Sequence, residues 1–273
     1  MRKLKSIYAV FAASALGVAM IVTGCSTVPV TGRSQLSLVS AGQEMQLGLS
    51  GFEALKKETP ISRDAAVNAL VQRVGKRIAA VAGKDMPNAQ WEFVVFESKD
   101  ANAFCLPGGK VGVNTGILPV TKDEAGLATV IGHEVAHAVA RHGAERMSEA
   151  MVTQTGGQLL GSTLSSADPR WQQVTMLAYG AGAKLGRELP HSRAQESEAD
   201  HIGLIYMARA GYDPKEAIAF WQRFSDYNKQ QGGGEASFFS KFLSTHPVDT
   251  DRIEQLKKWQ PEAQAEFRKS PTR

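Results

Sequence analysis

The sequence predicts an α+β fold that is mostly helical, with a small mixed β-sheet or hairpin beside one central helix. Apolar residues recur three and four positions apart over much of the chain, which is the spacing that places them on one face of an α-helix. Only two short stretches, residues 91–96 and 102–116, carry the residue types and turn signals of strands. No internal repeat interrupts this pattern, so we expect one compact domain.

The first 24 residues have the pattern of a secretory signal peptide. A short basic segment precedes an apolar run over residues 7–22, and two small residues then stand before Cys25. The run is shorter than the ~20 residues that a membrane span needs, which argues against a transmembrane anchor. Residues 22–25 also resemble a bacterial lipobox, in which Cys25 is lipidated. By resemblance to sorting signals, Ser26 favours the periplasmic face of the outer membrane, with the chain held there by lipid.

The positive formal charge belongs mostly to this leader. Arg2, Lys3 and Lys5 are three of the 31 basic residues, and no acidic residue leaves with them, so 28 basic residues remain against 27 acidic ones. No basic stripe is left as a footprint for nucleic acid, which is therefore not an expected partner. If Cys25 carries lipid, Cys105 is the only other cysteine and cannot form an internal disulfide.

The rest of the chain divides into three parts. Residues 25–45 are rich in Thr, Ser, Gly and Pro without periodicity, and we expect them to form a tether leading off the membrane. Residues 46–260 form the predicted domain, which is long enough for a sizeable core. Residues 261–273 are expected to be a C-terminal tail.

Within the domain, a helical pattern extends from residue 43 to about residue 81, with Asp64 near a helix start. Residues 91–96 follow as a strand. Residues 147–186 are rich in Gly, Ser, Ala and Leu, and we expect two helices with a loop between them that cover a cleft.

Residues 102–116 predict two short strands joined by a Pro-Gly-Gly turn. A strand just ahead of the central helix suits an edge that binds an extended peptide through main-chain hydrogen bonds. The alternative is an ordinary hairpin that caps the sheet. After it, Thr121 and Glu124 have the spacing of a capping box that would open the central helix.

The central helix contains the motif H-E-x-x-H at residues 133–137. Positions four apart lie one above the other on a helix, so His133 and His137 can offer two imidazoles to one ion, with Glu134 on the adjoining face. This pattern is typical of a zinc site with a general base. The alternative is a pair of ordinary helical histidines, but burying these polar groups in an apolar helix is costly unless they are paired or bind a metal.

Catalytic zinc sites take three protein ligands and keep a fourth position for water, so a third ligand is needed. Glu196 and Asp200 are four residues apart and would face the same way on a helix, whereas Glu198 would point roughly 200° around the axis from Glu196. This spacing allows Glu196 as the carboxylate ligand and Asp200 as an acceptor for the second N–H of a ligating histidine. The alternative is a solvated acidic face.

The combination of H-E-x-x-H, then E-x-x-A-D at residues 196–200, then Thr245-His246-Pro247 resembles the zinc metallopeptidase family of HtpX and the CAAX prenyl proteases. The resemblance extends over residues 44–256 and is nearest to soluble, periplasmic LoiP-like lipoproteins. It implies a zincin-like peptidase domain of the gluzincin type. No apolar span of ~20 residues follows the leader, which argues against prenylated or intramembrane substrates.

The resemblance also assigns roles to single residues. It implies His133, His137 and Glu196 as ligands of one Zn²⁺, Glu134 as the catalytic glutamate and Asp200 as its acidic partner. It places Asn102 and Ala103 on the substrate-binding strand.

His246 has two possible roles. It is either a turn histidine that fixes the entry of the last helix or a catalytic hydrogen-bond donor to the oxyanion, which the resemblance favours. His142 and His201 are expected beside the site rather than as ligands, and His191 near its approach.

The function that follows is a zinc metalloendopeptidase anchored in the cell envelope. Glu134 would assist the attack of a zinc-activated water on peptide bonds of misfolded or envelope proteins, as a protein quality-control protease. A second hypothesis is a chaperone-like or assembly-factor lipoprotein that binds outer-membrane proteins, with latent proteolysis. A third, a zinc hydrolase that does not act on peptides, is weakened by the peptide-binding strand.

Overall fold

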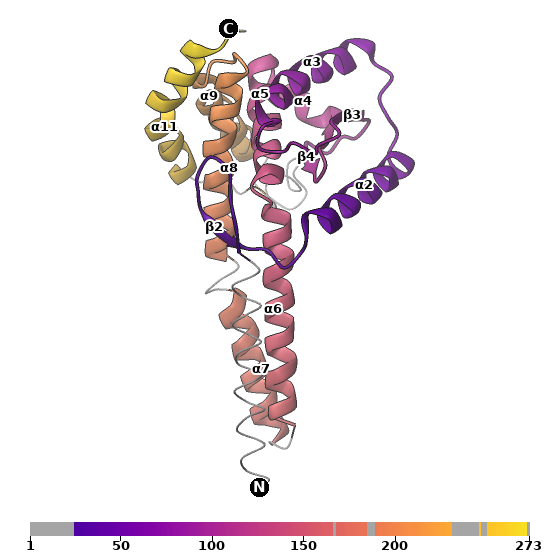
Figure 1. Cartoon of the computed structure of the whole chain (residues 1–273), viewed down its shortest axis with the longest axis vertical. Helices are drawn as coiled ribbons and strands as arrows, with labels where there is room; N and C mark the ends of the chain where they lie inside the picture. The colour runs from indigo at the N-terminus through magenta and orange to yellow at the C-terminus, as the bar shows by residue number, and fades with distance from the viewer. Residues whose placement is uncertain (1–24, 166–167, 185–188, 231–245, 247–249, 272–273) are drawn as a thin grey trace.

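The computed structural model describes residues 25–165, 168–184, 189–230, 246 and 250–271, so the predicted leader lies outside the described residues. The described elements (Figure 1) are β1 (Cys25–Thr27), β2 (Ser34–Leu36), α2 (Ala41–Glu58), α3 (Ala65–Ala82), β3 (Glu92–Phe96), β4 (Ala103–Leu106), β5 (Lys110–Asn114), the 3₁₀ turn η1 (Thr115–Ile117), α4 (Leu118–Thr121), α5 (Glu124–Val139), α6 (His142–Thr163), α7 (Pro169–Ala183), α8 (Leu189–Arg209), α9 (Lys215–Gln230) and α11 (Thr250–Lys269). The mostly helical α+β prediction is confirmed.

Helix α5 lies at the centre of the domain (Figure 1), in contact with α8 and α9, with α3, and with the small sheet. Its residues are apolar almost all round, and nearly all of them are buried. A helix of this composition is stable only inside a core. Large buried aromatic side chains, including Tyr206 of α8 and Trp221 of α9, form part of the same core.

The three-stranded sheet has the order β3-β5-β4. Strand β3 pairs with β5 in parallel, and β4 pairs with β5 in antiparallel register, with Phe104 opposite Gly112. The predicted hairpin is therefore present, and its Pro-Gly-Gly turn contains two glycines with positive φ, Gly108 (87°) and Gly109 (80°). An L-residue with a side chain rarely adopts that conformation.

Among the described residues, strand β4 forms one edge of the sheet, and the hydrogen-bond pattern shows which of its main-chain groups have no strand partner there. The backbone N–H of Asn114 donates to the carbonyl of Asn102. In an antiparallel pair, hydrogen-bonded and non-hydrogen-bonded positions alternate. Phe104 therefore occupies the next hydrogen-bonded position with β5, and the main-chain groups of Ala103 and Cys105 point away from β5, toward the open side.

The helical stretch predicted for residues 43–81 is two helices. Ser40 caps α2 in a capping box with Gln43, and Asp64 caps α3 by accepting from the N–H groups of Ala66 and Val67. Pro60 lies between the helices, where its ring and missing N–H are incompatible with a continuous helix.

The segment expected to be a tether is folded onto the domain as far as the structure describes it. β1 and β2 form an antiparallel pair, Val28 between them is buried, and α2 already begins at Ala41. One other local expectation was wrong, because Asp123 and not Thr121 caps α5, by accepting from the N–H of Gly126. Helix α11 extends through most of the expected tail, to Lys269.

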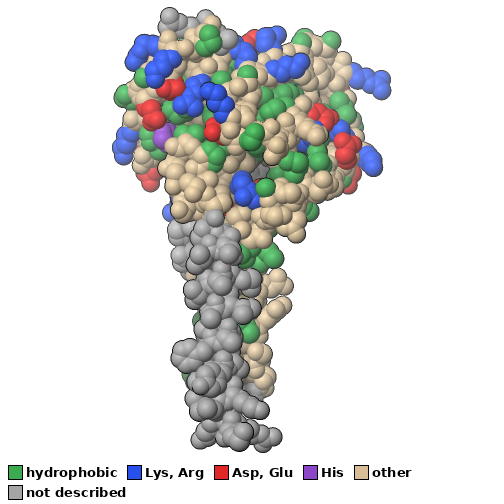
Figure 2. Space-filling model, viewed as in Figure 1, with side chains coloured by type: hydrophobic (Ala, Val, Ile, Leu, Met, Phe, Trp, Pro, Cys, Tyr) green, Lys and Arg blue, Asp and Glu red, His purple; other side chains and the backbone are tan. Residues whose placement is uncertain are grey.

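Helices α6 and α7 form a hairpin that projects away from the body (Figure 1). They are the two helices predicted between residues 147 and 186, but they extend outward instead of covering a cleft. Several large apolar side chains are exposed there, among them Leu159 (64%), Trp171 (70%) and Leu177 (66%). Figure 2 shows hydrophobic and neutral side chains on the uncovered part of the hairpin, whereas charged side chains gather on the body. Within the described residues, no helix has the length and apolarity needed to cross a membrane.

Candidate metal centre

Helix α5 supplies two histidines and a glutamate to one buried site. His133 and His137 are one helical turn apart, and their Nε2 atoms lie 3.1 Å from each other. Glu134 is buried on the adjoining face of the helix. This is the arrangement that the H-E-x-x-H spacing predicted.

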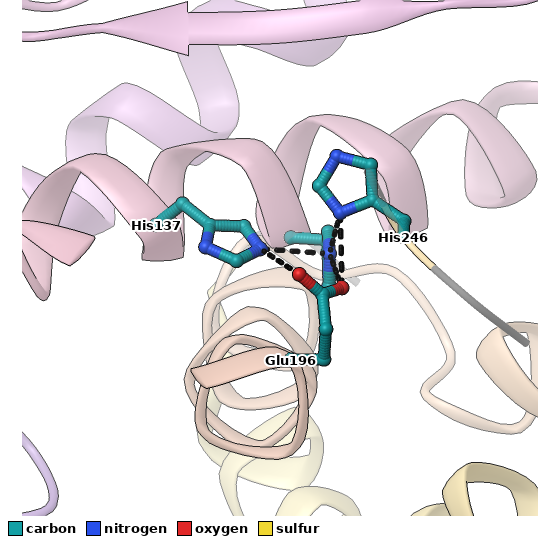
Figure 3. Close-up of side chains that lie close together, drawn as sticks. His137, Glu196 and His246 are labelled. Atoms are coloured by element: carbon teal, nitrogen blue, oxygen red, sulfur yellow. Dashed lines mark hydrogen bonds and ion pairs between the residues drawn. The ribbon is translucent and has the colours of Figure 1, made fainter. Parts of the chain in front are cut away.

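Helix α8 brings the carboxylate of Glu196 to these histidines. Its Oε2 lies 3.2 Å from Nε2 of His133, and its Oε1 lies 3.3 Å from Nε2 of His137. Figure 3 shows His137 and Glu196, from two different helices, pointing toward each other. Close packing of the helices makes this approach possible, because a Cβ added to Gly203 would stand 2.8 Å from the backbone N of His133.

His246 is the fourth member of the cluster, and its ring also points at Glu196 (Figure 3). Its Nδ1 lies 2.9 Å from Oε2 of Glu196 and 3.2 Å from Nε2 of His133. Its Nε2 lies 3.4 Å from Oε1 of Glu134. The structure therefore places His246 among the candidate ligands, and its expected role as an oxyanion donor stays a prediction.

Most spacings in the cluster are close to those around a tetrahedral metal ion. Zinc bonds of ~2.0–2.1 Å in tetrahedral geometry separate neighbouring ligand atoms by about 3.3 Å. Five of the spacings among His133, His137, Glu196 and His246 are 2.9–3.3 Å, with Glu196 facing His137 through Oε1 and the other two through Oε2. One ligand atom from each of the four residues falls within 4.8 Å of all the others.

The buried carboxylate of Glu134 is a second indication that the site binds a further polar group. Its Oε1 is buried and accepts no hydrogen bond from the described residues, although Nε2 of His246 lies 3.4 Å away. Leaving a carboxylate oxygen in this condition is costly, and such groups in folded proteins normally face a ligand, an ion or a water molecule. The residues present therefore fit a metal centre with a reactive group beside Glu134.

Asp200 contacts the ring of His133 on the side opposite the ligand cluster. Its Oδ1 is 2.9 Å from Nδ1 of His133, and the guanidinium of Arg252 donates to both of its oxygens at 2.7 and 2.8 Å. Burial would raise the pKa of Asp200, but Arg252 and His133 outweigh it and hold this pKa below its ordinary value. Asp200 thus remains an ionised acceptor, as expected for a residue that orients a ligating histidine.

The site drives the pKa values of its two glutamates in opposite directions. Burial would raise the pKa of Glu196, but hydrogen bonds from His133, His137 and His246 outweigh it and lower this pKa. Burial raises the pKa of Glu134, and the nearby histidines offset this only in part. Glu196 is therefore suited to remain an anionic ligand, and the raised pKa of Glu134 suits a group that takes up a proton.

An open cleft of about 290 Å³ lies beside the cluster. One wall is strand β4 with Asn102 and Ala103, and the other contains Glu134, His137 and the first turn of α6. None of the described residues from 147 to 184 lines this cleft, so the α6–α7 hairpin does not cover it.

The remaining histidines differ in their relation to the site. His142 lies beside it, with Nδ1 2.8 Å from Nδ1 of His137. His201 does not, because it pairs with Glu262 and stacks on Trp259 of α11. The side chain of His191 lies outside the described residues.

Two features of the site were not expected from the sequence. One is the position of His246 within ligand distance, and the other is a buried network that joins His142 and Glu198 to Arg33. Glu198 does point away from the ligands, as predicted, but toward this network and not toward solvent. Neither feature has a local sequence signal, because each depends on segments far apart in the chain.

Comparison with known proteins agrees with this geometry. A model of peptidase family M48 matches residues 65–260. The mitochondrial metalloendopeptidase OMA1 of Saccharomyces cerevisiae is 33% identical over 273 residues, covering 92% of this chain and 76% of that protein. OMA1 of Schizosaccharomyces pombe is 37% identical over 240 residues, covering 87% and 67%. The beta-barrel assembly-enhancing protease of Escherichia coli is 28% identical over 232 residues, covering 83% of this chain and 46% of that protein.

Proposed function

The chain belongs to peptidase family M48 and is a metalloendopeptidase, and on that premise we propose that it is a zinc-dependent protease of the bacterial cell envelope. We further propose that His133, His137 and Glu196 hold the zinc ion and that Glu134 is the catalytic base. The observation that carries this proposal is the mutual spacing of these three residues' ligand atoms, 3.1–3.3 Å, beside a buried glutamate.

The proposed chemistry is hydrolysis of a peptide bond. A bound zinc ion would lower the pKa of water to about 7 and polarise the substrate carbonyl. Glu134 takes the proton from the attacking water and passes it to the leaving amine, a role that typically contributes ~10²–10⁴-fold. Asp200, held by Arg252, keeps the ring of His133 in the orientation and tautomer that ligation requires.

Substrate would bind as an added strand along β4. The open main-chain groups of Ala103 and Cys105 are on the side of β4 away from β5, and Asn102 and Ala103 line the cleft next to Glu134. An extended peptide that pairs with this edge gains main-chain hydrogen bonds independently of its sequence. This arrangement suits an endopeptidase with broad sequence tolerance.

The proposed location is the periplasmic face of the outer membrane, with the chain anchored through lipid on Cys25. The lipobox-like residues 22–25 and Ser26 support this location. The similarity to an E. coli protease named for β-barrel assembly supports envelope proteins, in particular outer-membrane proteins, as substrates. Membership among the LoiP-like lipoproteins is part of the same proposal.

The exposed apolar side chains of the α6–α7 hairpin favour a second candidate function. Leu159, Trp171 and Leu177 offer a surface to which unfolded chains can bind without being cut. On this reading the protein is a chaperone-like assembly factor, and proteolysis is secondary. The two functions differ in whether the cellular task needs Glu134.

Glu134→Gln tests the proposal. Glutamine keeps the size of the side chain but cannot take the proton, so we expect bound zinc to remain and casein cleavage to fall by at least ~10²-fold. Zinc content and cleavage are measured on the same preparation. Glu254→Gln, the same change on an exposed glutamate paired with Lys257, is the matched control and should change neither.

Normal casein cleavage by Glu134→Gln would refute the assignment of the base. Full cellular function in a strain that carries only Glu134→Gln, despite lost cleavage, would favour the chaperone-like reading.

A further inference from the structure

The two histidines of α5, His133 and His137, each contact a different residue through Nδ1, on the side of the ring away from the ligand cluster. Nδ1 of His133 lies 2.9 Å from Oδ1 of Asp200. Nδ1 of His137 instead lies 2.8 Å from Nδ1 of His142, whose Nε2 lies 3.0 Å from Oε2 of Glu198. A carboxylate therefore stands behind each histidine, directly for His133 and through a second imidazole for His137.

We propose, resting on the proposed function, that His142 and Glu198 are positioning residues for His137. We include Thr31 and Arg33 of the N-terminal segment in this support, because they hold Glu198 in place. The metal centre would then depend on a part of the chain that lies before the family-matched residues 65–260.

The hydrogen positions follow from one requirement. A histidine that binds a cation through Nε2 presents a lone pair there, so its proton is on Nδ1. Nδ1–H of His137 then donates to Nδ1 of His142, and His142 carries its own proton on Nε2 and donates it to Glu198. The other neutral tautomer of His142 would aim two N–H groups at each other across 2.8 Å. Glu198 thereby fixes the tautomer of His142 and the orientation of His137.

The backbone places His142 for this contact. Arg141, between α5 and α6, adopts a left-handed conformation with φ 56° and ψ 34°. This conformation is uncommon for a residue with a side chain and turns the chain sharply. Arg141 is held by its hydrogen bonds to Glu44 and to the carbonyl of Val39. His142 is consequently buried against α5, with 1% of its surface exposed.

The N-terminal segment supplies the groups that hold Glu198. Arg33 Nε donates to Oε2 of Glu198 at 2.8 Å, and the hydroxyl of Thr31 donates to Oε1. The two terminal nitrogens of Arg33 donate to both oxygens of Glu145 at 2.7 and 2.9 Å. Glu145 and Glu198 are both buried, so without this guanidinium two carboxylates would repel each other inside the protein.

This arrangement links the candidate lipid anchor to the metal centre through a short path. Thr31 and Arg33 follow Cys25 by only a few residues, in the connection between β1 and β2. From Arg33, one carboxylate and one imidazole lead to His137. A displacement of the N-terminal segment would therefore leave Glu198 without its cation and loosen one zinc ligand.

The test measures zinc affinity of the full chain in detergent, by competition with a chelator of known affinity. Glu198→Gln and His142→Ala are each expected to weaken zinc binding by about 10–100-fold, as is usual when a partner of a ligating histidine is lost. Glu262→Gln is the control, since Glu262 also pairs with a histidine, His201, but one that is not a member of the ligand cluster.

Two further readouts separate positioning from general stability. His142→Asn is expected to recover part of the affinity lost in His142→Ala, because its side-chain oxygen can accept the same hydrogen bond from His137. The visible spectrum of the Co²⁺-loaded protein is expected to change in His142→Ala and not in Glu262→Gln, because it reports the arrangement of the ligands.

Zinc affinity of folded Glu198→Gln within about twofold of the wild type would overturn the proposal. If Glu198→Gln does not fold, His142→Asn and Arg33→Lys decide instead. Affinity weakened by at least about threefold in either variant supports the proposal, and unchanged affinity in both overturns it. Failure of the wild-type chain to bind zinc would overturn the proposed function as well, and so differs from failure of this inference alone.

Discussion

His246 is the fourth member of the ligand cluster, in which three residues would suffice to hold a catalytic zinc ion. Zinc sites with four protein ligands are closed, whereas three protein ligands leave one position open. With its Nδ1 2.9 Å from Oε2 of Glu196, the ring would compete with water or a substrate oxygen for the fourth position when zinc is bound. Its Nε2, 3.4 Å from Glu134, also faces the catalytic carboxylate.

We expect His246→Ala to retain zinc through the three remaining ligands and to cleave peptides at least as fast as the wild type, because the fourth position is then open. The measurement is kcat/KM on a peptide substrate, together with the zinc content of the same sample. A fall of about 10²-fold or more with zinc retained would instead support a role in donating a hydrogen bond to the developing negative charge.

The sequence predicted most of the site residues because helical periodicity determines them. Spacing alone placed His133 and His137 on one face of α5, and it separated Glu196 and Asp200 from Glu198. The position of His246 could not be predicted, because it depends on a contact with Glu196, 50 positions earlier in the chain. Likewise, no local pattern relates Arg33 to Glu198, 165 positions further on.

At the scale of elements, the site depends on how closely α5 and α8 approach. The two helices meet at Gly132 and Gly203, where their backbones are in contact. Any larger residue would separate the helices and withdraw Glu196 from the two histidines. The glycines therefore set the size of the ligand cluster.

Gly203→Ala is expected to destabilise the chain by about 1–3 kcal/mol and to weaken zinc binding, because the added Cβ would stand 2.8 Å from His133 N and 2.9 Å from Gly132 C. Urea unfolding and a zinc titration are the measurements. Gly161→Ala in α6 is the matched control, because an added Cβ there meets nothing within 4 Å. It should be neutral or stabilising by up to about 1 kcal/mol. Equal stability of the two variants would contradict this account.

The elements that the sequence predicted well are those with a strong internal pattern, such as α5 and the β4–β5 hairpin. The expected tether and tail differ from the structure because distant partners order both segments. Arg33 joins the N-terminal segment to Glu145 and Glu198. Ala263, beyond the expected domain end, is fully buried and holds the last turns of α11 on the body.

At the scale of the whole molecule, a bound zinc ion would join two helices that are distant in sequence. The proposed ligands His133 and His137 belong to α5, and Glu196 belongs to α8. We expect a chelator to lower the midpoint of thermal unfolding by on the order of 10 °C. An ion present at 1,000 times its dissociation constant contributes about 4 kcal/mol, and each kcal/mol is worth about 2–4 °C in a chain of this length.

The measurement is the midpoint of thermal unfolding under three conditions: without chelator, with chelator, and after zinc is restored. His137→Ala is the control, since a chain that has lost a ligand should respond little. An unchanged midpoint in the wild type, with metal removal verified, would contradict the expected contribution of the ion to stability.

The open side of β4 has a consequence for which proteins the chain would cut. Only a segment that is already extended, with its own main-chain groups not yet engaged, can pair with Ala103 and Cys105. A segment that is already paired within a folded protein is not in that condition. Cleavage would then be governed by how long a segment stays unpaired, and not by its sequence.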